Sequence, residues 1–401
     1  MSTERPAQTR LNEWCVATDT IELTRTFRLR LETSDQKLAP VDRAISQWQE
    51  IAEETARIMP SFNRYQWKPR NTSLRRTVTD RLDDHGLYAH DRTAAINKVA
   101  EAFSSWESRG CPGDYPAGEY GDSQYLRMST SSSSKKRRQL VAHDDGSFGL
   151  QVNILKPHDP IWFGVQVGEY QRERLAEVVD EDSPTRLGVV ELRRGDGDEL
   201  YAHVSVSWPV EVYKPGEVTT RVGVDIGERV LYSVAVIGSD GVETVELESG
   251  REFRHVREEL TRKRDRRSAN DDLRGVLQTR REREKYTEQV THTASRRIVE
   301  IAADHTPCVI HLEDLSDYRQ TAHNAIHDWP FAMLQDQITD KAAAAGIPVE
   351  TVNPAQTSMT CRQCGETNPQ FRDGDDFECW ECGYQVHADV NAAMNIATRE
   401  P

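Results

Sequence analysis

Long apolar runs, lysine and cysteine are all scarce in this sequence. No stretch approaches the roughly 18 consecutive apolar residues that a membrane-spanning helix requires, and the opening MSTERPAQTR lacks the apolar segment of a signal peptide. Of the seven cysteines, Cys15, Cys111 and Cys308 are isolated and the other four are paired at metal-binding spacing, which argues against a disulfide framework. We therefore expect a cytoplasmic protein without a membrane anchor.

The balance of charge is strongly acidic. Asp and Glu number 66 against 51 Lys and Arg, the formal net charge is −15, and arginine supplies most of the positive charge. This balance argues against a general affinity for phosphate backbones. It also resembles the composition of an acidic, high-salt proteome, because a Debye length of about 3 Å at 1 M salt screens much of the charge. Partial unfolding in dilute buffer is the consequence that we expect.

The N-terminal half changes its periodicity twice. Residues 24–31, TRTFRLRL, alternate apolar and polar positions as a strand does. Over residues 38–110 the apolar positions follow helical spacing, which indicates a small helical domain inserted after that strand. Residues 111–138 have the composition of a linker. Strand patterns dominate residues 140–213, so we expect a β-barrel or β-sandwich that the first strand completes.

The order of the elements after Pro215 is informative. Three strand patterns joined by tight turns precede a long polar helical region, a strand, a helix opened by Pro330, a fifth strand and a last helix. This is the order of a ribonuclease-H-type fold, with the cysteine segment inserted before the last helix. The predicted fold class is multidomain α+β, with the helical domain inserted in the β-barrel and a ribonuclease-H-like α/β domain after it.

Four cysteines form two Cys-x-x-Cys-Gly knuckles with fourteen residues between them, at Cys361, Cys364, Cys379 and Cys382. Four thiolates at this spacing indicate a structural zinc ribbon. Because sulfur fills every position of such a site, the zinc is architectural, and we expect the ribbon to shape the entrance to a site rather than take part in chemistry. A redox pair is the alternative, but the doubled motif argues against it.

Three carboxylates could converge in this fold. Asp225 lies inside the first strand after Pro215, Glu313 ends the fourth strand, and Asp389 begins the last helix. The first and fourth strands of a ribonuclease-H-type sheet are neighbours, and the last helix packs over their edge. Close carboxylates repel unless cations bridge them, and an oxygen-only ligand set suits Mg²⁺ or Mn²⁺. A pair of such ions supports phosphodiester hydrolysis.

Each acid also has a structural alternative. Asp389 could cap its helix, and Glu313 could be a surface acid at the end of a strand. Asp225 is disfavoured inside a strand, but it could belong to a phosphate-binding Asp-x-Gly hairpin. We expect Asp314, next to Glu313, to face the other way, because side chains alternate along a strand.

A positive stripe runs through the polar helical region. Thirteen Lys or Arg residues lie between Arg251 and Lys285, a density that fits contact with phosphates. The interleaved glutamates leave an alternative, a solvated helix with Glu–Arg pairs. The candidate nucleic-acid contacts are Arg262, Lys263, Arg264, Arg266 and Arg267.

Several segments together resemble a known family. They are GVDIG around Asp225, HLEDL around Glu313, WPFAML, NPAQTSMTCRQCG, ECWECG and HADVNAAMNIA, in that order. They resemble TnpB, the OrfB-type protein of insertion sequences, and the nuclease half of type V CRISPR effectors. The close resemblance covers about residues 216–398, and the earlier part is similar only in architecture. One departure is Ala388, where the family usually has a basic residue just before the third acid.

The resemblance implies an RNA-guided, Mg²⁺-dependent DNA endonuclease with a RuvC-like domain, associated with transposition. Asp225, Glu313 and Asp389 would be its catalytic acids and would bind Mg²⁺ or Mn²⁺, and the four cysteines would bind structural Zn²⁺. The implied partners are a guide RNA from the element's own end, target double-stranded DNA and a transposase encoded nearby, with action at the nucleoid. The implied domains are a barrel strand at 1–37, a helical recognition domain at 38–110, a linker at 111–138, a wedge-like β-barrel at 139–215, a RuvC-like nuclease domain at 216–357, a zinc ribbon at 358–386 and the last RuvC-like helix at 387–401.

Two other functions stay open from the sequence. One is a guided DNA-binding or regulatory protein of the same fold that does not cleave, which the loss of an acid would favour. The other is an actin-like ATPase, because GVDIG followed by a strand also suits that fold. An ATPase would need a second phosphate-binding Asp-x-Gly hairpin and a Gly-rich adenosine loop, and we find neither in the sequence.

Overall fold

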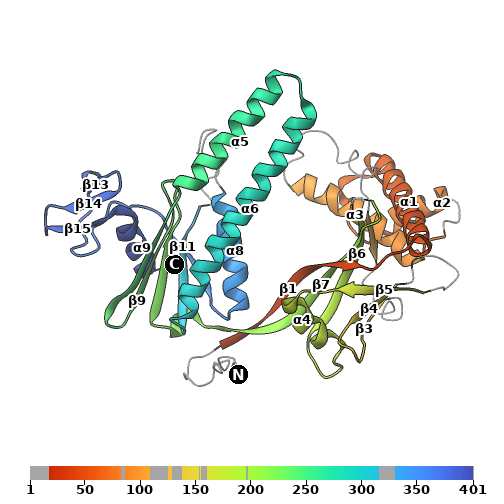
Figure 1. The fold of residues 1–401 in the computed structure, drawn as a ribbon, viewed down its shortest axis with the longest axis horizontal. Coiled ribbons are helices and arrows are strands. Elements are labelled where there is room, and N and C mark those ends of the chain that lie inside the picture. The colour runs from red at the N-terminus through yellow and green to blue at the C-terminus, as the bar shows by residue number, and fades with distance from the viewer. Residues whose placement is uncertain are drawn as a thin grey trace. The chain divides into compact units, whose positions relative to one another are not determined.

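The computed structural model describes residues 18–82, 86–108, 125–128, 138–152, 154, 160–195, 197–315 and 330–400. The chain divides into two compact units (Figure 1), one formed by Glu22–Pro209 and the other by Val210–Pro401 together with Met1–Ile21. Cys15, Cys111 and most of the predicted linker lie outside the described residues.

Three helices of the first unit lie where the sequence predicts helical spacing. They are α1 (Asp35–Ile58), α2 (Thr72–Arg81) and α3 (Ala89–Ser108), with short 3₁₀ turns between α1 and α2. α1 buries Val41, Ile45 and Trp48 at helical spacing, and it packs against α3. The rings of Trp67 and Phe103 meet edge to face with their centroids 5.4 Å apart, which is a favourable aromatic geometry.

The first unit also contains a seven-stranded sheet. Its strands are β1 (Thr18–Leu31), β2 (Tyr125–Met128), β3 (Arg138–Ala142), β4 (Phe148–Val152), β5 (Ile161–Gln166), β6 (Arg186–Arg194) and β7 (Leu200–Tyr213). The order β2-β6-β7-β1-β5-β4-β3 places β1 at the centre, where it joins the later strands as predicted. Among the described strands β2 and β3 are opposite edges, so the predicted β-barrel is an open sheet over this part of the chain.

One helix in this unit was not predicted. α4 (Glu169–Val179) lies between β5 and β6 in a region where the sequence predicts strands. Its sequence EYQRERLAEVV buries only Leu175, so it carries no apolar stripe at helical spacing. Without that stripe the periodicity argument has no signal to detect.

The second unit is built on a five-stranded sheet. Its strands are β8 (Thr220–Asp225), β9 (Val230–Gly238), β10 (Gly241–Ser249), β11 (Cys308–Glu313) and β12 (Val349–Val352). They lie in the order β10-β9-β8-β11-β12, with β8, β9 and β10 antiparallel and β11 parallel to both β8 and β12. β8 is therefore the central strand of the sheet, and β11 lies between it and the edge strand β12.

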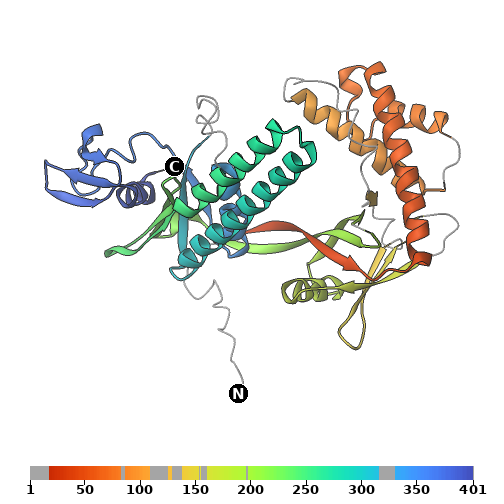
Figure 2. The same cartoon turned by 45° about the horizontal axis from the view of Figure 1, so that its top comes forward.

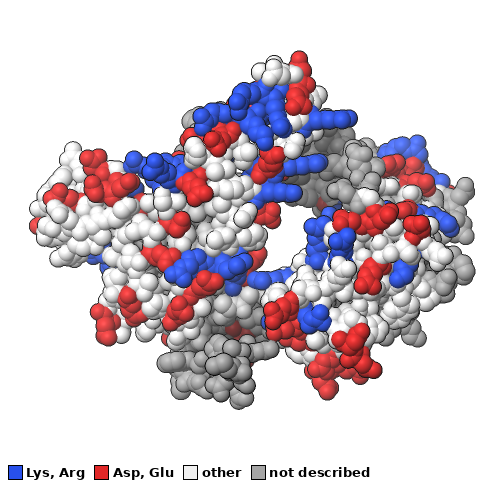
Figure 3. All heavy atoms as spheres, viewed as in Figure 1, with Lys and Arg blue, Asp and Glu red and all other residues white. Residues whose placement is uncertain are grey.

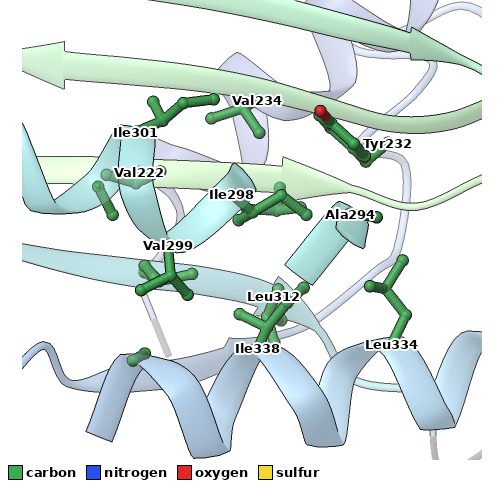
Figure 4. Packing of buried hydrophobic residues seen from close by; sticks show 14 of the residues in the cluster. Val222, Tyr232, Val234, Ala294, Ile298, Val299, Ile301, Leu312, Leu334 and Ile338 are labelled. Atoms are coloured by element: carbon green, nitrogen blue, oxygen red, sulfur yellow. The ribbon is translucent and has the colours of Figure 1, made fainter. Parts of the chain in front are cut away.

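Different helices cover the two faces of this sheet. α6 (Leu273–Ala303) and α8 (Phe331–Ala344) cover the face that we call the core face, where side chains such as Val222, Ile298 and Ile338 form one apolar cluster (Figure 4). α9 (Ala388–Thr398) packs on the other face, which we call the α9 face, against β8 and β9. Side chains alternate along each strand, so neighbouring residues of β8 serve opposite faces.

α5 (Arg251–Ala269) and α6 form a helical hairpin, visible from two directions in Figures 1 and 2. The Asp272 side chain caps the start of α6 by accepting a hydrogen bond from the Gly275 amide at 2.9 Å. Lys263 and Glu282 form an ion pair between the two helices at 2.6 Å. In the part of the chain that the structure describes, no helix combines the length and the apolar character needed to cross a membrane.

The zinc-ribbon segment folds as a separate three-stranded sheet next to α9 in sequence. Its strands are β13 (Arg372–Asp373), β14 (Asp376–Cys379) and β15 (Tyr384–His387), paired in that order as antiparallel neighbours. α9 follows β15 directly and contacts it, so the orientation of the ribbon and the start of α9 are linked.

Candidate functional site

The register of β8 and β11 brings two of the predicted acids together. The parallel pairing places Leu312 beside Val224, so the next residues of the two strands, Glu313 and Asp225, lie side by side at the carboxyl ends of β11 and β8. The neighbouring Asp314 is exposed and its amide donates to the Val352 carbonyl oxygen at 2.9 Å. The sheet thus selects Glu313, not Asp314, as the partner of Asp225.

The third acid, Asp389, lies in the first turn of α9 and is buried, with 8% of its surface exposed. It is not the helix cap, which corrects that alternative. The cap is His387, whose Nδ1 accepts the Asp389 amide at 3.2 Å. The Asp389 carboxylate therefore does not cap α9, and it can act together with the other two acids.

Gly223 allows α9 to lie directly on the sheet. A Cβ atom at this position would collide with the Ala393 carbonyl oxygen and the Ala397 amide nitrogen of α9. On the adjacent strand, the His311 ring lies 3.2 Å from the Ile396 carbonyl oxygen. Gly223 and His311 are register partners, so both mark the α9 face, and by alternation Asp225 and Glu313 belong to the same face.

The charges of Glu313 and Asp389 act on Asp225. Burial, and after it the charges of Glu313 and Asp389, raise the pKa of Asp225 to about 8, whereas Arg372 and the Ile226 amide oppose the shift. Burial also raises the pKa of Glu313, against the hydrogen bond from Thr357. Neighbouring acids resist ionising together unless a cation joins them, and carboxylate oxygens are the ligands that divalent metal ions such as Mg²⁺ take.

Two side chains hold Glu313 from outside the sheet. Thr357 Oγ1 donates to Glu313 Oε1 at 2.6 Å, and the Gln335 side-chain amide donates to the Glu313 carbonyl oxygen at 2.8 Å. Asn395 of α9 donates to the Thr357 carbonyl oxygen at 2.8 Å. The segment after β12 therefore holds Glu313 and α9 in one hydrogen-bonded arrangement.

Arg372 is the residue of this site that sequence reasoning missed. It lies on β13 of the ribbon, and its guanidinium donates to Asp389 Oδ1 at 2.7 Å. Ala388, the departure from the family pattern, is fully buried in the ribbon's apolar cluster with Phe371 and Phe377. The positive charge beside Asp389 is therefore the Arg372 guanidinium, which the ribbon supplies. The expectation that the ribbon only shapes the entrance to the site is too narrow. A lone arginine in a loop-rich segment gives no sequence signal for this role.

The four cysteines come together as predicted. Their sulfur atoms lie within 4.8 Å of one another. The sulfur atoms of Cys361 and Cys382 are 3.7 Å apart, and those of Cys364 and Cys379 are 3.6 Å apart. Tetrahedral zinc with Zn–S bonds of about 2.3 Å places its sulfurs about 3.8 Å apart, so the residues fit a zinc ion.

Each cysteine knuckle ends in a glycine with a left-handed backbone. Gly365 has φ +82° and Gly383 has φ +73°, a conformation that suits glycine. Their amides donate to the carbonyl oxygens of Cys361 and Cys379 at 2.9 and 2.7 Å. These turns fold each Cys-x-x-Cys back on itself and bring the paired sulfurs to one point.

The predicted nucleic-acid contacts all lie on α5, but they differ in their surroundings. Arg262 and Arg266 are exposed, whereas Lys263 pairs with Glu282 and Arg264 pairs with Asp265. Arg267 donates to the Gly275 carbonyl oxygen at 2.6 Å and so holds the hairpin turn. Figure 3 shows Lys and Arg side chains gathered over the α5–α6 hairpin, with acidic side chains among them.

Comparison with solved structures shows the class of fold. The chain matches a cryo-EM structure of a Cas12f1–sgRNA–target DNA complex with a TM-score of 0.57 and 14% identity, over 96% of this chain and 99% of that chain. The chain therefore has a mixed α/β multidomain fold like that of Cas12 effectors. A model of the Cas12f1-like TNB domain matches residues 331–396, which include the cysteine ribbon and most of α9.

Sequence relatives narrow the comparison to TnpB-like proteins. A TnpB-like protein of Methanocaldococcus jannaschii is 24% identical over 261 residues, 61% of this chain and 88% of that protein. The CRISPR-associated endodeoxyribonuclease Cas12f1 of Sulfoacidibacillus thermotolerans is 37% identical over 113 residues, 28% of this chain. The matched part of the chain spans between 14% and 31% of the length of the Cas12f1 relatives. These matches confirm the predicted resemblance to TnpB and to type V CRISPR effectors.

Proposed function

We propose that this protein is an RNA-guided, divalent-metal-dependent DNA endonuclease of the TnpB type. One observation carries the proposal: Asp225 and Glu313 lie side by side on β8 and β11, and the charge of Asp389 on the helix packed over that face acts on Asp225. The matched Cas12f1 relatives are named endodeoxyribonucleases, which supports the same chemistry here.

In this proposal the five-stranded sheet with its helices is a RuvC-like, ribonuclease-H-like nuclease domain, and the ribbon is its zinc-stabilised insertion. Asp225, Glu313 and Asp389 hold Mg²⁺ or Mn²⁺. When bound, such ions activate a water molecule and stabilise the leaving oxygen in phosphodiester hydrolysis. Thr357 fixes the orientation of Glu313, and Arg372 balances the charge of Asp389.

The partners in this proposal are a guide RNA and target double-stranded DNA. The matched Cas12f1 structure is a complex with sgRNA and target DNA, which supports these partners. Arg262 and Arg266 are the exposed candidates for phosphate contact, although Arg262 also donates through Nε to the Glu258 carbonyl oxygen at 3.3 Å. Lys263 and Arg264 pair with acids, and Arg267 holds the hairpin turn. The helical domain would serve in recognition of the nucleic acids. A link to transposition and a transposase encoded nearby follow from the TnpB type. The protein would act at the nucleoid.

The first experiment is to purify the full chain from its native cell and sequence the RNA that it retains. We expect a uniform RNA encoded beside the gene, and cleavage of matched DNA that requires Mg²⁺. Asp225→Ala should abolish cleavage and retain the RNA, since the acid touches the metal and not the guide.

Three results would contradict parts of the proposal. Cleavage by the Asp225→Ala variant would contradict the assignment of Asp225 to the catalytic site. The absence of a bound RNA would remove the guided function. Guided binding of DNA without cleavage by the wild type would favour the alternative, a targeting or regulatory protein of the same fold.

A further inference from the structure

One buried polar side chain on the α9 face has no role in the site as described so far. Ser233, on β9, is completely buried, and its Oγ makes no hydrogen bond with any residue that the structure describes. The other polar side chain of the buried part of β9, Tyr232, donates its hydroxyl to Glu246 at 3.0 Å. A buried hydroxyl left unpaired lowers the stability of the fold, so Ser233 is an unfavourable residue among the Val and Ala residues that follow it.

The register of the sheet places Ser233 beside the candidate metal site. β8 and β9 are antiparallel, and Ser233 is the direct partner of Asp225. Directly opposed residues of such strands have side chains on the same face, with Cβ atoms about 4.5–5.5 Å apart. The pair two residues along, Gly223 with Ala235, confirms the face: Gly223 lies under α9, and Ala235 packs with Val390 and Ala393 of α9.

The Asp225 carboxylate can accept more than one hydrogen bond. The Ile226 amide donates one, and Glu313, Asp389 and Arg372 act on the carboxylate through their charges. A carboxylate has about four acceptor positions, and ligating carboxylates are usually oriented by a hydrogen bond from a neighbour. Ser233 is a hydroxyl donor at the position directly across the strand.

We infer that Ser233 is a positioning residue for Asp225: in the metal-bound state its hydroxyl donates to the Asp225 carboxylate and fixes which oxygen faces the divalent cation. This inference rests on the proposed function, because it assigns Asp225 to the metal. It also accounts for the unpaired hydroxyl, which is retained at a cost in stability for the sake of the bound state.

The alternative is that Ser233 only fills space on β9. The two roles predict opposite results for Ser233→Ala. If the hydroxyl has no partner in the working state, removing it should leave metal affinity unchanged and stabilise the fold. If it positions Asp225, removing it should weaken metal binding while thermal stability stays the same or rises.

The test measures Mn²⁺ binding to the full chain by electron paramagnetic resonance, with thermal unfolding in the absence of Mn²⁺. Asp225→Ala identifies the signal of the candidate site, because it should remove that site and leave other surface binding in place. We expect Ser233→Ala to weaken that site about tenfold, a loss typical of residues that orient metal ligands. The matched control is Ser295→Ala, a buried hydroxyl on α6 that donates to the Thr291 carbonyl oxygen at 2.7 Å, and it should leave Mn²⁺ affinity unchanged.

The outcomes separate this inference from the proposed function. Wild-type Mn²⁺ affinity in Ser233→Ala, with the site lost in Asp225→Ala, would overturn the role of Ser233 alone. Weaker binding accompanied by a lower unfolding temperature would assign Ser233 to packing and also overturn it. Wild-type binding in Asp225→Ala would overturn the metal site of the proposed function, and the inference with it.

Discussion

The two faces of the five-stranded sheet differ in what they contain, although the same strands supply both. On β8, Val222 and Val224 face the apolar core under α6 and α8, whereas Gly223 and Asp225 belong to the α9 face. The core face is continuous and apolar, and the α9 face combines a small apolar patch with three acids and an unpaired hydroxyl. The comparison teaches that the core face holds the larger apolar cluster, whereas the α9 face places charged and polar groups beside a smaller one.

The largest effect should follow from removing the zinc ligands next to the α9 face. Cys379→Ser should release the zinc and unfold the ribbon, because structural zinc binding of about 10–16 kcal/mol in small domains is also folding energy. The core face should stay folded. Metal analysis of the purified protein, with limited proteolysis between residues 358 and 387, checks this.

Cys308→Ala is the control for that experiment. Cys308 is buried on the core face, where its sulfur donates to the Ala302 carbonyl oxygen at 3.2 Å. This variant should keep its zinc. If Cys379→Ser retained a full complement of zinc, the ribbon would not be a four-sulfur site.

The second prediction concerns the core face itself. Ile298→Ala removes a fully buried side chain of α6 from the apolar cluster, and it should lower the free energy of unfolding by about 2–5 kcal/mol. The folded fraction should bind Mn²⁺ as the wild type does, because Ile298 lies on the opposite side of the sheet from Asp225. Denaturant unfolding and Mn²⁺ titration measure the two quantities. A large loss of Mn²⁺ affinity in the folded protein would show that the two faces are coupled, and it would contradict their separate roles.

Sequence reasoning reached the core face and the three acids by different signals. Regular alternation and helical spacing identify strands and helices that bury apolar side chains, and Asp225 stands out because it lies inside such a strand. Glu313 and Asp389 are singled out only by their places in the order of a ribonuclease-H-type fold. The cysteine knuckles are equally visible because their spacing is fixed by the geometry of the metal.

The contacts between distant segments could not be predicted in this way. Arg372 is one arginine among many, and only the fold brings it to Asp389. Ser233 is an ordinary strand residue until the register places it opposite Asp225. α4 has one buried residue and so no periodic signal, and the open sheet of the first unit depends on edges that the strand pattern does not encode.

The third prediction is a dependence of metal binding on pH. The pKa of Asp225 is raised to about 8, so the metal-free folded protein holds a proton there at neutral pH. A divalent cation must displace that proton, so Mn²⁺ affinity should rise by up to about tenfold per pH unit until the pH passes the folded pKa, and then level off.

The same shift affects the metal-free fold with a definite sign. The folded pKa lies above the unfolded value of about 3.9, so the folded state binds the proton more tightly between these values. Stability without metal should therefore fall as the pH rises through that window. Mn²⁺ titrations at fixed ionic strength measure the dependence, and Asp225→Ala should flatten it. A wild-type affinity that did not change as the pH rose toward 8 would contradict the coupling of the acids on the α9 face.

The smallest effect should come from Arg372→Gln. Arg372 neutralises Asp389 and keeps 30% of its side-chain surface in solvent, so its loss should destabilise the metal-free protein by about 1 kcal/mol. Bound Mn²⁺ supplies positive charge to the same acids, so the difference from the wild type should shrink when Mn²⁺ is added. Thermal unfolding with and without Mn²⁺ measures this. Arg229→Gln breaks an exposed ion pair between the β8–β9 turn and Asp375 of the ribbon and should show no such dependence on Mn²⁺. An equal deficit for Arg372→Gln in both conditions would mean that the arginine stabilises the ribbon alone and has no part in the charge balance of the α9 face.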